Sequence, residues 1–169
     1  LRFQDHPLLE HNLAMARVMH YREGFGMVLR PDTDVAYRLP TGEAEHRIRI
    51  NPQGYRMDRP VSRRPAAGAH RILTVGDSMT FGLGVEGDRA WSAQLERSLQ
   101  EHDPGGAYEV INAGFASGIC PLPQYLYLRD RGLALAPRTV IVGFFPVNDI
   151  KDMAGYRERA GSKGEPVGM

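Results

Sequence analysis

The stretch that decides the fold is Arg71-Ile-Leu-Thr-Val-Gly-Asp-Ser-Met-Thr-Phe-Gly-Leu-Gly-Val85. Residues 72–75 are mostly apolar and β-branched, which predicts a short buried strand. Gly76-Asp77-Ser78 follows directly, and a serine lifted out of a sheet by a tight turn is a candidate nucleophile. Considered alone, Ser78 is explained more simply as a helix N-cap. The choice depends on which residues the rest of the chain brings to the same place.

From Arg71 onward the chain alternates between strand and helix patterns. Strands are expected at 72–75, 108–112 and 139–145, and helices at 90–100, capped by Asp88, and at 122–133. The third strand is nearly all apolar, as a strand buried on both faces would be. This alternation predicts an α/β fold, a three-layer flavodoxin-like parallel sheet that is incomplete at its C-terminal end. Right-handed crossovers would bring the carboxyl ends of all three strands to one edge, where such sheets bind ligands.

The first third of the chain follows a different pattern. We expect a helix from Asp5 and Pro7 to about His20, then short antiparallel strands at 35–39 and 45–50. The sequence thus predicts an N-terminal extension, 1–69, before a truncated α/β domain, 70–169. The connector carries a cluster of arginines, which we interpret as a solvated linker in preference to a phosphate-binding patch: Arg56, Arg59, Arg63 and Arg64.

The composition is that of an ordinary globular chain of 169 residues, with 42% hydrophobic and 24% charged residues. A net charge of +1 provides no global field for nucleic acid or an anionic membrane, so no nucleic-acid partner is expected. Cys120 is the single cysteine, which excludes a disulfide within the chain. No apolar run approaches the ~20 residues of a membrane-spanning helix. The chain opens without methionine, so we expect an excised or processed product from which any targeting segment is gone.

Three polar segments follow the three predicted strands. They are Gly76-Asp77-Ser78, Asn112-Ala113-Gly114 and Val147-Asn148-Asp149. Acyl transfer through a serine needs a nucleophile together with hydrogen-bond donors aimed at the developing oxyanion. The backbone N–H groups of Ser78 and Gly114 and the side-chain amide of Asn148 would supply three such donors.

These segments carry a family resemblance. Gly76-Asp77-Ser78-Met79-Thr80-Phe81-Gly82-Leu83-Gly84-Val85 looks like block I of the SGNH (GDSL-type) hydrolases. Val110-Ile-Asn-Ala-Gly114, followed by Gly118, resembles block II, and Phe144-Phe-Pro-Val-Asn-Asp149 is similar to block III. Asn51-x-x-Gly54-Tyr55-Arg56 also resembles the segment that precedes block I in some bacterial members.

The resemblance implies a serine ester hydrolase with Ser78 as nucleophile and with Gly114 and Asn148 completing the oxyanion hole. It implies a sugar, lipid or small acyl ester as substrate, and no cofactor or metal. Pro146 departs from block III, where a glycine is usual. The larger departure is the missing Asp-x-x-His block that supplies the general base, because no histidine follows Asn148. We therefore expect this chain alone to be inactive or nearly so, and its parent protein to continue with an Asp/His pair.

The histidines that are present do not replace that base. The first four lie in the extension, whereas the other two lie at the end of the sheet away from Ser78, and all are expected to be surface or packing residues: His6, His11, His20, His46, His70 and His102.

Other interpretations use the same residues. An acyltransferase would need only a different acceptor, and a binding module could keep the fold with Ser78 as a cap alone. Gly82-Leu-Gly-Val-Glu-Gly87 matches a dinucleotide fingerprint, but it begins too far after the strand. The remaining features are expected to be turns and packing, not metal sites or a substrate platform: Asp32/Asp34, Asp149/Asp152, Tyr125, Tyr127 and Leu128. An uncovered sheet edge could pair with another chain, so an oligomer is possible.

Overall fold

The predicted parallel sheet is present in a computed structural model that describes residues 7–22, 26–41, 44–116, 121–147, 149–151 and 153. Its strands are β5 (His70–Gly76), β6 (Tyr108–Gly114) and β7 (Thr139–Gly143), in the order β6-β5-β7. Both neighbours pair with β5 in parallel. The strand that precedes Ser78 is therefore the central one, which confirms the α/β fold class and the flavodoxin-like order.

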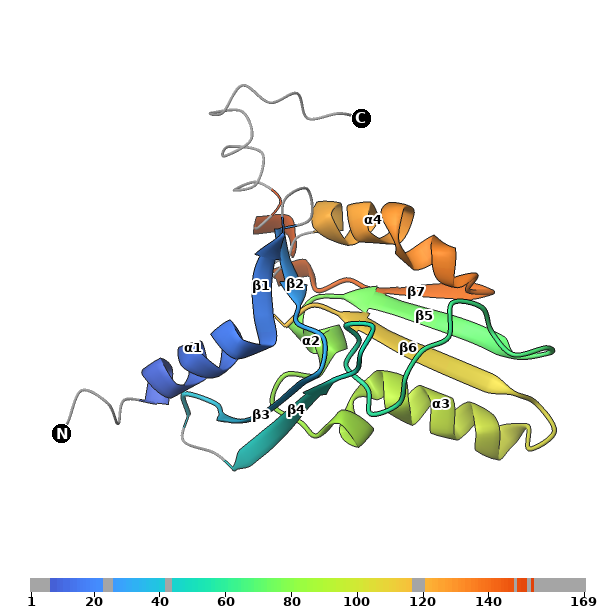
Figure 1. Ribbon diagram of the computed structural model, residues 1–169, viewed down its shortest axis with the longest axis horizontal. Helices are drawn as coiled ribbons and strands as arrows, with labels where there is room; N and C mark the ends of the chain where they lie inside the picture. The colour runs from blue at the N-terminus through green and yellow to red at the C-terminus, as the bar shows by residue number, and fades with distance from the viewer. Residues whose placement is uncertain are drawn as a thin grey trace, which may run out of the picture.

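Helices cover both faces of this sheet, so the unit has three layers (Figure 1). α3 (Trp91–His102) packs on one face, mainly against β6, and α4 (Pro121–Asp130) lies over the other. The prediction that Asp88 caps the first helix is wrong: Asp88 lies in the 3-10 turn η2 (Gly87–Arg89), and Ala90 occupies the cap position without a side-chain bond. The helix ends in the second crossover also differ, because α4 stops at Asp130 and a separate 3-10 turn, η3 (Gly132–Leu135), follows.

The third strand is shorter and more exposed than its composition predicts. β7 ends at Gly143, and its residues are only partly buried, with Val142 at 55% exposure. The reason is position, because β7 lies at the edge of the described sheet and has one neighbour. Tyr125 and Leu133 are likewise exposed and not part of the helix core, whereas Tyr127 and Leu128 pack on the sheet as expected.

The N-terminal residues form α1 (Pro7–Val18) and two hairpins. The β3 (Thr33–Arg38) and β4 (Glu45–Ile50) pair confirms the predicted antiparallel strands, with Val35 opposite Ile48. The sequence did not predict the first hairpin, β1 (Met19–Arg22) with β2 (Gly26–Leu29). Asp5, the expected helix cap, lies outside the described residues. Both hairpins and α1 share a hydrophobic cluster with Phe81, so this part packs directly against the turn after β5.

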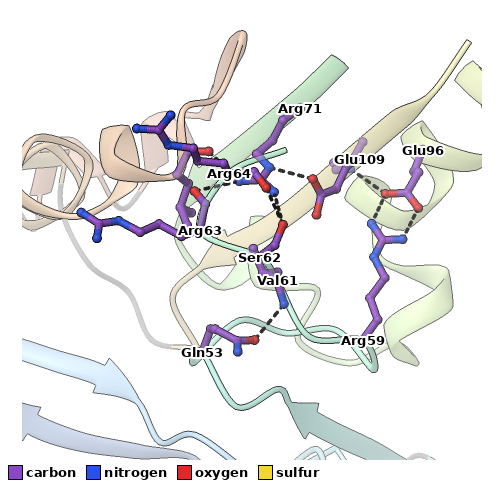
Figure 2. A network of polar contacts seen from close by, with 11 residues as sticks. Gln53, Arg59, Val61, Ser62, Arg63, Arg64, Arg71, Glu96 and Glu109 are labelled. Carbon is purple, nitrogen blue, oxygen red and sulfur yellow. Dashed lines mark hydrogen bonds and ion pairs between the residues drawn. The ribbon is translucent and has the colours of Figure 1, made fainter. Parts of the chain in front are cut away.

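Residues 51–64, which we name the strap, are anchored to the α/β unit and are not a solvated linker. Arg59 forms a bidentate ion pair with Glu96 of α3, at 2.5 and 2.6 Å (Figure 2). The fully buried Arg71 pairs with Glu109 at 2.7 Å and also donates to the hydroxyl of Ser62 and to carbonyl groups of the strap and η3. Arg56 is only 3% exposed, so the interpretation as a solvated residue is wrong for Arg56, whereas Arg63 and Arg64 are exposed as expected.

None of the helices in the described part of the chain combines the length and apolarity needed to cross a membrane.

Candidate active site

Ser78 is the first residue of α2 (Ser78–Phe81), a single helical turn that follows β5 at the carboxyl edge of the sheet. Asp77, not Ser78, is the N-cap, and its Oδ1 accepts a hydrogen bond from the N–H of Met79 at 2.9 Å. Gly82 ends the turn with a φ of 85°, a left-handed conformation that suits glycine. Because Asp77 fills the capping role and Ser78 is half-exposed, the cap interpretation of Ser78 loses its support.

A row of three glycines lets α2 lie directly on the sheet. Gly76 of β5 is opposite Gly114 of β6 and Gly143 of β7. A Cβ atom on Gly76 or Gly143 would come within 2.1 or 2.2 Å of Thr80 Oγ1, and one on Gly114 within 2.2 Å of the Phe81 nitrogen. These distances are far below contact. A side chain at Gly114 would collide with the backbone of the serine turn, and one at Gly76 or Gly143 would displace the side chain of Thr80.

Two polar side chains hold the same turn, and sequence reasoning missed both. The buried Asn112 donates its Nδ2 to the carbonyl oxygens of Thr80 at 3.1 Å and Phe81 at 3.3 Å. Arg56 donates to the carbonyl oxygens of Phe81, Gly82 and Val85. A signal for Asn112 existed, since an amide in an otherwise apolar strand must find partners when buried.

Of the two residues predicted to complete the oxyanion hole, only Gly114 lies within the described part of the chain. The N–H of Gly114 donates to Asn112 Oδ1 at 3.0 Å, so in this structure it already has a partner. Asn148 and Gly118 lie outside the described residues. The loop next to Asn148 is held by Asp149, whose Oδ2 accepts from the N–H of Phe145 at 2.8 Å. Pro146 opens the helical turn there, a position that tolerates its missing N–H.

A cavity of about 160 Å³ lies beside Gly114. Its wall includes His20, Phe115 and the hydroxyl pair of Tyr55 and Tyr127, whose oxygens are 3.0 Å apart. Burial is the main cause that raises the pKa of Tyr55, and it holds the pKa of Tyr127 well above its usual value. The cavity therefore joins aromatic walls to neutral hydroxyl groups next to the carboxyl edge of β6.

A larger hollow of about 850 Å³ lies between β4, the strap and α3, and Ser78 does not line it. Several of the charged groups on its wall pair with one another or with neighbouring acids: Arg59 with Glu96, Arg49 with Asp58, and Arg47 with Asp34. This pairing leaves the hollow without an evident charge preference.

The acidic pairs considered for metal binding have other roles where they are described. The hydrogen bond from Arg47 is the main cause that lowers the pKa of Asp34. Asp32 takes a left-handed φ of 55° in the turn before β3, and Asp152 lies outside the described residues. Within the described ranges, no group of three or more His, Cys, Asp or Glu side chains is arranged to hold a metal ion.

The described histidines have varied contacts. His70 begins β5 and its Nε2 lies 2.9 Å from Thr139 Oγ1, at the amino end of the sheet, away from Ser78. His102 ends α3. His46 lies 3.9 Å from Glu86 and beside the ring of Tyr37. Among the residues that the structure describes, no histidine forms a hydrogen bond with Ser78.

The fold and this site define an α/β protein with a half-exposed serine on the turn after its central parallel strand. No family model matches the sequence. The chain is 29% identical over 109 residues to Esterase TesA of Pseudomonas aeruginosa, a match over 60% of this chain and 53% of that protein. The chain therefore spans about half the length of this curated relative. The name of this relative agrees with the ester hydrolase that the resemblance implies.

Solved structures similar to this one include AlinE4, an SGNH-hydrolase family esterase, at 24% identity and a TM-score of 0.38. The overlap covers 60% of this chain and 58% of AlinE4. A variant of the same esterase matches at 22% identity and a TM-score of 0.37, with the same coverage.

Proposed function

We propose that the protein is a serine ester hydrolase in which Ser78 is the nucleophile. The observation that carries this proposal is the placement of Ser78: half-exposed at the carboxyl edge of the central strand, on a turn that Asp77 caps and the glycine row seats. The similarity to a protein named an esterase supports the same reaction class. The substrate class is a sugar, lipid or small acyl ester.

In the proposed reaction the Ser78 oxygen attacks the carbonyl carbon of the ester. Its proton passes to a general base and then to the departing alcohol as the ester C–O bond breaks, which leaves an acyl group on Ser78. Water then attacks the acyl-enzyme, the acid is released and the serine regains its proton. The base is a histidine expected beyond residue 169, so the 169-residue chain alone should have little activity.

The oxyanion of each tetrahedral intermediate requires hydrogen-bond donors. We assign this role to Asn148 and Gly114, together with the N–H of Ser78. For Gly114 the assignment carries a condition, because its N–H must leave Asn112 Oδ1 before it can bind the substrate oxygen. Removal of one such donor typically lowers the rate on the order of 10²–10³-fold.

A fluorophosphonate probe tests the nucleophile directly. We expect the full-length protein to gain one probe adduct by intact mass and the adduct to map to Ser78. Ser78→Ala should abolish it, whereas Ser98→Ala, on the exposed face of α3, should label like the wild type. A well-folded full-length sample that leaves Ser78 unlabelled would overturn the proposal. Product analysis with an ester substrate and an added alcohol then distinguishes hydrolysis from acyl transfer.

A further inference from the structure

We propose that Arg56 is a positioning residue for Ser78, whose buried guanidinium holds the serine turn through the carbonyl oxygens at the turn's carboxyl end. This inference rests on the proposed function for its catalytic readout. The contact itself is independent of that function and has its own measurement below.

The guanidinium of Arg56 binds backbone oxygens at three positions. Nη1 donates to the carbonyl of Phe81 at 2.8 Å and to that of Gly82, and Nη2 donates to Val85 at 2.6 Å. The guanidinium carbon also lies 4.5 Å from the centre of the Phe81 ring. One side chain thus contacts the last residue of α2, its C-cap and the loop beyond.

The charge of Arg56 is compensated in an unusual way. A buried cation normally pairs with a carboxylate, yet none of the ion pairs in the described part of the chain includes Arg56. Its hydrogen-bond partners are backbone carbonyl groups, two at the end of the helical turn, at Phe81 and Gly82, and one in the loop beyond, at Val85. If the turn opened, the guanidinium would lose these carbonyl acceptors and its contact with the Phe81 ring, so the contacts favour the closed turn.

Arg56 is fixed from the sheet and not from the turn. Its own N–H donates to the carbonyl of Asn112 in β6 at 3.3 Å. The flanking strap is tied at Arg59, whose carbonyl accepts from Asn51 Nδ2 at 2.8 Å and whose side chain pairs with Glu96 (Figure 2). Arg56 therefore links the turn to the sheet, because its backbone binds β6 and its side chain binds the turn.

The path from Arg56 to Ser78 is short. Arg56 binds the carbonyl of Gly82, and the N–H of Gly82 donates to the carbonyl of Ser78 at 3.0 Å. A shift of about 1 Å in a reacting group can cost about 100-fold in rate. Loss of Arg56 should consequently lower kcat, with little change in KM, because the guanidinium contacts the backbone carbonyls that follow Ser78 and not Ser78 itself.

The test compares Arg56→Ala, Arg56→Lys and the control Arg49→Ala in the full-length protein. Arg49 is a half-exposed arginine on β4 that pairs with Asp58 of the strap and does not contact α2. The readouts are kcat and KM with a p-nitrophenyl ester, the rate of fluorophosphonate labelling, and amide hydrogen exchange at Phe81 and Gly82. Each is repeated with millimolar guanidinium ion, which can refill the space left in Arg56→Ala.

We expect Arg56→Ala to lower kcat and the labelling rate about 10- to 100-fold, to speed exchange at Phe81 and Gly82, and to recover partly with guanidinium. Arg56→Lys should lie between it and the wild type, and Arg49→Ala should match the wild type with no response to guanidinium. Unchanged kcat and exchange in a folded Arg56 variant would overturn the proposal, as would a loss that Arg49→Ala shares. If Arg56→Ala does not fold, Arg56→Lys decides by the same readouts. If the wild type does not label, the proposed function fails, and exchange at Phe81 and Gly82 still tests Arg56.

Discussion

Gly76 and Gly114 lie opposite each other in the parallel pairing of β5 and β6, and α2 rests on both. Gly76 makes room for the side chain of Thr80, whereas Gly114 makes room for the backbone of Phe81. Gly114 therefore has a packing role that holds whether or not its N–H ever binds an oxyanion. A substitution at Gly114 should therefore lower the stability of the fold, whatever it does to catalysis.

Gly114→Ala should destabilise the fold, because its Cβ would lie 2.2 Å from the Phe81 nitrogen, an atom that cannot rotate away. We expect a loss of about 1 to 3 kcal/mol in the free energy of unfolding, measured by urea titration. Gly87→Ala is the matched control, since a Cβ there meets nothing within 4 Å. Equal midpoints for the two variants would contradict the close approach of α2 to β6.

Asn112→Ala should loosen the turn by removing hydrogen bonds and not by adding a steric clash. It removes the donor to the carbonyls of Thr80 and Phe81 and leaves the Gly114 N–H without its partner. A loss of about 1 to 3 kcal/mol in stability is expected for the buried groups left unpaired. The measurement is urea unfolding together with amide exchange at Gly114, which should become faster. Protection of that amide in the variant would show that Asn112 is not its main partner.

Arg71→Met should be among the most damaging single changes outside the glycine row. The arginine is fully buried, and its loss leaves Glu109, with a side chain 19% exposed, short of its ion-pair partner. We expect a loss of about 3 kcal/mol in the free energy of unfolding, measured by thermal or chemical denaturation. Arg38→Ala breaks the exposed pair with Glu45 and should cost less than about 1 kcal/mol. The prediction fails if the two variants unfold alike.

Alkaline pH should weaken the fold through the Tyr55–Tyr127 pair. The folded-state pKa of both phenols is raised above the ordinary value of 10.0, so the unfolded chain loses these protons first. The contribution is fully present below pH 10.0 and is lost as the pH rises through and above that value. Urea unfolding from pH 8 to 11.5 should therefore decline less steeply in Tyr127→Phe than in the wild type.

Tyr125→Phe is the control for that measurement, because Tyr125 is exposed on α4. It should keep the wild-type decline. At pH 8, Tyr127→Phe should itself lose about 1 kcal/mol, the contribution of one hydrogen bond. An identical alkaline slope in all three proteins would contradict the raised pKa of Tyr127.

The sequence predicted those features that depend on local pattern. The apolar run of β5, the alternation in β4 and the order of strands and helices could be predicted from the sequence, because each reflects the burial of residues that are close together in the chain. The β1 strand was not, since Met19 and His20 continue the helical pattern of α1. The exposure of β7 depends on how many neighbours the strand has, which its own residues do not encode.

The same distinction holds for the candidate site, where the sequence predicted local features but not contacts between residues far apart in the chain. The sequence predicted Ser78 on the turn after the first strand of the sheet, but it did not predict that this strand is central or that Asp77 is the N-cap. Arg56 was assigned to a solvated linker because its carbonyl partners lie at least 25 residues away along the chain. The catalytic roles of Ser78, Gly114 and Asn148 remain predictions, as does the boundary at residue 69.

The strap limits where the protein can be shortened. A version starting at Ala69 would retain the three described strands of the parallel sheet. It would, however, remove the Ser62 partner of Arg71 and the Arg56 contacts of the serine turn. It would also expose Phe81, which the hairpins and α1 cover. For crystallisation or expression trials, residues 51–64 belong with the sheet, even though they contain none of its strands.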